Sequence, residues 1–272
     1  MKHKYLIWFP VAVLLSACSG EGSKGNQEQT DSVVSEEVIK SENTKYKLPS
    51  PVELYLLLRE AKAQFNLDAM NNVDKVANYL TSTQKAINFG IYASDLAYCT
   101  VFEKQQETHT FFKILKILAT QLGVTEGYDN AIVSRIDKNL YNSDSLYQIT
   151  SDSYWEVCNY LEENGKANVL APILMGGWVE SVYLSINSVD KFDANNEIVM
   201  RITEQRYLLE NLLDYLKTLH KDPETEKYIK MLVELQSSFD KLYDNPDNIL
   251  ITRDQYKEIS QKVKAIRSEM VK

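Results

Sequence analysis

Two long stretches of the sequence are almost free of charge, and they constrain the fold more than any other feature. Residues 86–102 contain Asp95 as their single charged side chain, and residues 167–189 contain only Glu180. A helix that is apolar on most of its sides has to be covered on most of its sides, so it lies at the centre of its bundle. We therefore expect two central helices with other helices packed around them.

The other segments repeat apolar residues every three or four positions, which is typical of amphipathic helices with one buried face. The clearest stripes are Ile198, Ile202, Leu209, Leu212, Leu216 and Leu219, and then Tyr256, Ile259, Val263 and Ile266. Strand-like alternation is absent, and only nine Gly and six Pro interrupt the chain. The sequence predicts an all-α helical bundle of about 8–10 helices.

Local signals mark several helix ends. Capping residues predict helix starts at Ser50-Pro51, Thr81, Asp222-Pro223 and Thr252. Pro follows the capping residue in two of these cases, and Gln stands three positions later in the other two. Gly123 and Gly165 follow helical stretches and predict helix ends. The polar stretch 103–108 fits either a turn or the exposed middle of one long helix.

Glycines interrupt both central helices, at Gly90 in the first and at Gly176 and Gly177 in the second. A glycine inside a helix costs about 1 kcal/mol relative to alanine, so it usually marks a close approach of two backbones. Residues 90–94 (GIYAS) also loosely match residues 177–181 (GWVES). We expect two related halves, 48–141 and 142–243, each around a central helix and followed by a C-terminal helix at 252–270, although a match this short also arises by chance.

The two isolated acids have three interpretations. A carboxylate on an otherwise apolar helix must find a partner or become protonated. Asp95 and Glu180 can therefore brace neighbouring helices, which is the first expectation. They can instead line a ligand pocket with aromatic residues, above all Tyr92 and Trp178, with Tyr98 and Tyr183 nearby. The third interpretation is that the pair performs acid–base catalysis.

The first residues of the chain have the pattern of an export signal. A basic start at residues 2–4 precedes an apolar run at 5–15, which is shorter than the roughly 20 residues that cross a membrane. Leu15-Ser16-Ala17-Cys18 then resembles the lipobox of bacterial lipoproteins. The resemblance implies that residues 1–17 are a signal peptide and that Cys18 carries acyl chains, palmitate among them, as a stable membrane anchor.

The segment after the lipobox determines where the anchored protein resides. With Ser19 directly after the Cys, the chain resembles lipoproteins that enterobacterial-type cells sort to the outer membrane. Few acids follow Ser19, and this favours the periplasmic face over the cell surface. Up to residue 47 the chain is polar and cannot bury enough apolar surface to fold, so residues 18–47 are the lipidated Cys and a disordered tether. The body spans residues 48–272. Its general pattern resembles uncharacterised all-helical lipoproteins of Bacteroidota-type bacteria.

Composition excludes several functions. The formal net charge is −8, and it becomes −10 when Lys2 and Lys4 leave with the signal peptide, so we expect no nucleic-acid partner. His109 and His220 are the only later histidines and have no metal-ligand spacing. We find no nucleophile elbow or phosphate-binding glycine loop, and expect no metal or cofactor. Cys99 and Cys158 can form a disulfide in an oxidising compartment or remain buried thiols.

These observations predict an outer-membrane-anchored lipoprotein with a non-catalytic binding or scaffolding module in the periplasm. Its partners would be the membrane, through the lipid anchor, and another protein. The first alternative is a small-molecule binding protein with its pocket between the helices that bear Asp95 and Glu180. The second alternative is a hydrolase of an unrecognised class.

Overall fold

A computed structural model describes residues 51–125, 135–136, 138–139, 142–219 and 222–272. The described residues belong to one compact unit. The expected signal peptide, Cys18 and the tether lie outside this range, as do Ser50 and His220.

Every regular element among the described residues is a helix, so the protein is an all-α helical bundle as the sequence predicts. The α-helices are α1 (Pro51–Glu60), α2 (Ser82–Val101), α3 (Gln105–Leu122), α5 (Ser143–Glu163), α6 (Ala167–Asn187), α7 (Glu197–Lys217), α8 (Pro223–Asp240) and α9 (Arg253–Met270). Short 3-10 helices are η1 (Leu67–Ala69), η2 (Val73–Asn78) and η4 (Lys241–Asp244).

The predicted caps determine where several of these helices begin. The Thr81 hydroxyl accepts a hydrogen bond from the backbone N–H of Gln84, whose side chain returns to the Thr81 backbone, and Thr252 does the same with Gln255. The Asp222 carboxylate caps α8. These bonds satisfy N–H groups that have no partner inside the helix.

Left-handed residues end helices and separate α2 from α3. Gly123 and Gly165 adopt φ values of 65° and 67°, and Gly123 caps α3, as predicted. Residues 103–108 contain a turn rather than a helix middle, because α2 ends at Val101 and Glu103 has a φ of 58°. Residues other than glycine rarely adopt this left-handed backbone conformation. The amino-acid composition of residues 103–108 therefore did not indicate a turn over a continuous helix.

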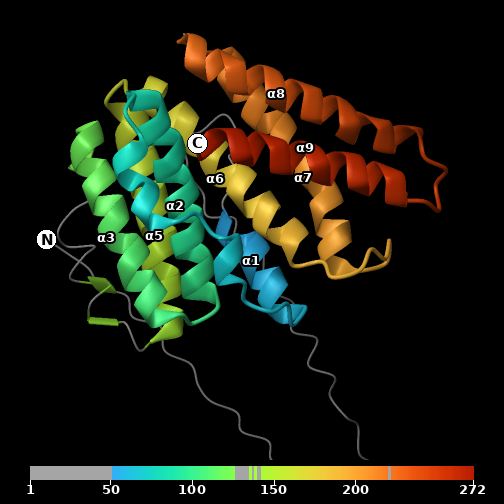
Figure 1. The fold of residues 1–272 in the computed structure, drawn as a ribbon, viewed down its shortest axis with the longest axis horizontal. Helices are drawn as coiled ribbons and strands as arrows, with labels where there is room; N and C mark the ends of the chain where they lie inside the picture. Colours follow the sequence, from blue (N-terminus) through green and yellow to red (C-terminus); the bar gives the residue numbers. More distant parts are fainter. Residues whose placement is uncertain (1–50, 126–134, 137, 140–141, 220–221) are drawn as a thin grey trace, which may run out of the picture. The chain divides into compact units, whose positions relative to one another are not determined.

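The two predicted central helices pack directly on each other. In Figure 1, α2 lies with α3 and α5, while α7, α8 and α9 gather on the other side of α6. Helix α5 contacts both α2 and α6, and α9 also contacts both. The second half of the chain therefore helps to cover the central helix of the first, and the internal repeat stays a prediction.

Glycine makes the contact between α2 and α6 possible. A β-carbon added at Gly90 would lie 2.0 Å from the carbonyl oxygen of Ile173, and one at Gly176 would lie 2.1 Å from that of Ile87. Real β-carbons do not approach that closely, so only glycine fits at these two positions. At Gly177 the nearest atom would be 3.4 Å away, which is ordinary contact.

Helix α6 is the one described helix that is long and apolar enough to cross a membrane. Within its most apolar window, 89% of the residues are buried inside the structure. Burial by protein on all sides is what the central helix of a bundle requires. We therefore interpret α6 as a core helix.

The glycine contact predicts a difference between adjacent substitutions. Gly176→Ala should lower the free energy of unfolding by about 3 kcal/mol, because the methyl group forces the two backbones apart. Gly177→Ala should stay within about 1 kcal/mol of the wild type, because alanine favours the helix and has room there. Urea unfolding of both variants measures the difference, and equal stabilities would contradict the proposed close approach.

Candidate functional site

The structure brings Asp95 and Glu180 together in the centre of the bundle. Asp95 comes from α2 and Glu180 from α6, and each is 0% exposed. The two carboxyl groups lie close enough for each to shift the pKa of the other. Their meeting follows from the glycine contact, which holds the two central helices at a short separation.

Arg267 neutralises one of these acids. Its Nε donates to Oε2 of Glu180 at 2.9 Å, and its Nη2 donates to Oε1 at 3.1 Å. Two parallel hydrogen bonds between a guanidinium and a carboxylate make a strong, directional pair. Glu180 is therefore the ionised acid, and it fixes α9 against α6.

Asp95 is the neutral acid. Its Oδ2 accepts a hydrogen bond from the backbone N–H of Asn71 at 3.1 Å, whereas its Oδ1 finds no donor in the described part of the chain. Two buried carboxyl groups that lie close together are not both ionised, because their negative charges repel each other, so one of them keeps a proton. With Glu180 occupied by Arg267, the proton belongs on Asp95.

Burial and charge agree with this assignment. Burial raises the pKa of Asp95 well above its ordinary value, and the negative charge of Glu180 raises it further. Burial also raises the pKa of Glu180, but the guanidinium of Arg267 opposes that shift. Burial lowers the pKa of Arg267, but Glu180 outweighs this effect and raises it overall, so the arginine stays charged.

A second polar group extends this network to the end of α9. The side-chain amide of Asn71 donates to the Tyr79 hydroxyl at 3.0 Å and to Oδ1 of Asn88 at 3.2 Å. Asn88 in turn donates to the carbonyl oxygen of Met270 at 2.9 Å. The segment around Asn71, α2, α6 and α9 are therefore tied together by buried polar contacts.

The two aromatic residues of the predicted pocket are also buried in the core. Tyr92 is 0% exposed, and its hydroxyl donates to the carbonyl oxygen of Asn72 at 2.8 Å. Trp178 is 2% exposed, and its indole N–H has no hydrogen-bond partner among the described residues. Since both acids are likewise inaccessible, a ligand could reach them only if this network opened. Ligand binding there stays a prediction.

Sequence reasoning missed Arg267, although the chain carries a signal for it. Val263, Arg267 and Met270 follow the three-to-four spacing of the buried stripe of α9. A cation on such a stripe needs a buried anion, just as an acid on an apolar helix needs a partner. Glu180 is the single acid of α6, and Arg267 is a cation on the buried stripe of α9, so the two together indicate a buried ion pair.

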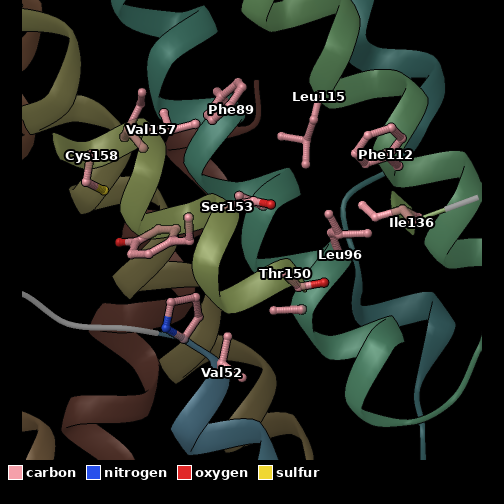
Figure 2. A pocket seen from close by; sticks show the side chains of 15 residues that line it. Val52, Phe89, Leu96, Phe112, Leu115, Ile136, Thr150, Ser153, Val157 and Cys158 are labelled. Atoms are coloured by element: carbon pink, nitrogen blue, oxygen red, sulfur yellow. The ribbon is translucent and has the colours of Figure 1, made fainter. Parts of the chain in front are cut away.

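An apolar cavity lies elsewhere in the bundle, among α1, α2, α3, α5 and α6 (Figure 2). Its volume is about 30 Å³, and Phe89, Leu115 and Val157 are among its lining residues. A space of that size holds about one water molecule, and an apolar lining leaves it dry. The cavity is therefore a packing defect and is too small for a metabolite.

The two cysteines of the body are unpaired and buried. Burial raises the pKa of Cys158 to about 12, and it also raises the pKa of Cys99. A thiol that stays protonated is a poor nucleophile. Of the two sequence alternatives, the structure has the buried thiols.

Comparison with known proteins gave no match to a family model, a curated protein or a solved structure. Within the described ranges, no group of three or more His, Cys, Asp and Glu side chains is placed to hold a metal ion. His109 lies on α3.

The assignment of the proton predicts opposite results for two conservative substitutions. Asp95→Asn should leave the protein at least as stable at neutral pH, because the amide replaces the protonated carboxyl and can donate to Glu180. Glu180→Gln should lower the free energy of unfolding by about 3 kcal/mol, because it leaves the Arg267 charge without its partner. Urea unfolding measures both, and a greater loss for Asp95→Asn would reverse the assignment.

The same assignment sets the sign of a pH dependence. The folded state keeps a proton on Asp95 that the unfolded chain loses near pH 4, roughly the ordinary pKa of an aspartate. Wild-type stability should therefore fall relative to Asp95→Asn as the pH rises from about 4 toward the raised pKa of the folded state.

Proposed function

We propose that this protein is a lipoprotein anchored to the outer membrane through Cys18, with a non-catalytic helical module that binds another protein in the periplasm. The lipobox-like Leu15-Ser16-Ala17-Cys18 supports the anchor, and the polar segment 18–47 supports a tether. The burial of Asp95 and Glu180 supports a non-catalytic role, because neither acid reaches a substrate in solution.

A surface cluster of a partly buried arginine and two exposed tyrosines carries the proposal of a protein partner. The guanidinium of Arg206 lies 4.5 Å from the ring centre of Tyr207 and 4.4 Å from that of Tyr243. These tyrosines are 47% and 58% exposed. Tyrosine and arginine are the residue types that contribute most at protein interfaces, and Arg206 holds both rings in place before binding.

A hollow beside this cluster adds a place for a partner's side chain. It has a volume of about 330 Å³ and lies between α1 and α7, with Leu54, Tyr207 and Leu208 in its lining. Its lining is mixed, because Glu53, Arg201, Glu204 and Gln205 are also among its residues. These polar and charged groups can pair with polar groups of the partner, as in the polar part of a protein–protein contact.

The anchor is tested by membrane fractionation. Cys18→Ala should release the protein from the membrane fraction, because it removes the thiol to which the lipid would be attached. Ser19→Asp should keep the protein on a membrane but move it to the inner one in an enterobacterial-type host. Retention of Cys18→Ala on the outer membrane would contradict the proposed anchor.

The protein partner is tested by site-specific photo-crosslinking in cells. A photo-reactive phenylalanine at Tyr207 should give one defined adduct, and Arg206→Ala should abolish it because the rings lose their support. The same probe at Ile117, which is 44% exposed on α3, is the control. The same adducts at both positions, or an adduct that survives Arg206→Ala, would argue against this cluster as the binding surface.

A further inference from the structure

A surface hollow at the junction of α6, η2 and the end of α9 has an unusual concentration of positive charge. Its volume is about 420 Å³, and its lining includes Lys75, Tyr183, Lys264, Arg267, Val271 and Lys272. Four of the lining side chains are cationic and none is acidic, although the chain as a whole has a net charge of −8. Positive charge gathered in a concave surface attracts anions.

Arg267 forms a rigid part of this hollow. Two of its nitrogens, Nε and Nη2, are held by Glu180, and its guanidinium lies 4.7 Å from the ring centre of Tyr183. Its remaining nitrogen, Nη1, makes no hydrogen bond within the described part of the chain, and 13% of the side chain is exposed. A donor already fixed in position loses little entropy when it binds a ligand.

Two lysines supply charge that no acid neutralises among the described residues. The ammonium group of Lys75 donates to the carbonyl oxygen of Val271 at 2.8 Å, which positions it without cancelling its charge. Lys264 is exposed and has no ion-pair partner in the described ranges. Lys272 differs, because it pairs with Glu269. The uncompensated charge of the hollow therefore comes from Lys75 and Lys264 beside a fixed guanidinium.

We propose that this hollow binds a phosphate-type oxyanion, carried by a soluble phosphate ester or by a lipid headgroup. Phosphate offers several oxygens that can accept hydrogen bonds from more than one of these cations, and guanidinium and ammonium groups are its common ligands in proteins. The volume leaves room for the group to which the phosphate is attached. This site is separate from the Arg206 cluster, so it does not depend on the proposed protein partner.

Calorimetric titration of the full chain with inorganic phosphate, at constant ionic strength set with chloride, tests the proposal. Phosphate should bind with a stoichiometry of one. Lys264→Gln should weaken binding about tenfold, because it removes one charge-assisted hydrogen bond from an exposed residue that the fold does not need. Lys230→Gln on α8 changes the net charge equally, away from the lining of the hollow, and should bind phosphate like the wild type.

The other outcomes of these titrations either overturn the proposal or distinguish a soluble phosphate ester from a lipid headgroup as the ligand. No binding at tens of millimolar phosphate, or equal weakening by Lys264→Gln and Lys230→Gln, overturns it. If phosphate binds, glycerol phosphate and dihexanoyl phosphatidic acid then offer the same phosphate group without and with acyl chains. Equal affinity for both supports a soluble ester, whereas tighter binding of the lipid that is lost in Lys264→Gln supports a headgroup.

Discussion

The backbone contact between α2 and α6 determines the arrangement of the interior. At Gly90 and Gly176 no side chain separates the two helices, so each helix meets a carbonyl oxygen of the other directly. That approach brings the single acid of each helix into the same place. Two buried carboxyl groups cannot both be ionised at such a short separation, so one keeps a proton and the other needs a cation. The position of α9 follows, because α9 carries that cation.

The buried Asp95–Glu180–Arg267 group specifies the packing of three helices at once. Apolar side chains of the same volume would often give equal stability, so the energy of the ion pair alone does not explain such a group. Its geometry is more selective than apolar contact. A shift of α9 by one residue would separate Arg267 from Glu180 and leave two buried charges unpaired, whereas an apolar interface would tolerate the same shift at lower cost.

The sequence predicted the features that depend on local or periodic patterns. The caps at Thr81, Asp222 and Thr252 are properties of a few adjacent residues, and the burial of α2 and α6 follows from their lack of charge. It could not predict the partners of the two acids, because Arg267 lies 87 residues from Glu180 along the chain. Nor could it predict the role of Asn71. Its backbone N–H donates to Asp95 only because of the conformation of the loop between η1 and η2. Polar composition alone did not reveal the turn at Glu103, which depends on a left-handed backbone conformation.

Among the described residues, the two fully buried acids therefore serve the structure, and the groups available to a ligand lie on the surface. This changes what the acidic composition means for function. Averaged over the chain, negative charge repels anions, but a small hollow responds to the charges that line it, since salt screens charges beyond about 8–10 Å. Arg267 belongs both to the core and to the surface, because two of its nitrogens bind the buried Glu180 and its side chain also lines the hollow. Formation of the core thus also positions Arg267 as a hydrogen-bond donor for a ligand at the surface. Lys75 and Lys264 then need only add positive charge beside a group that the fold already holds in position.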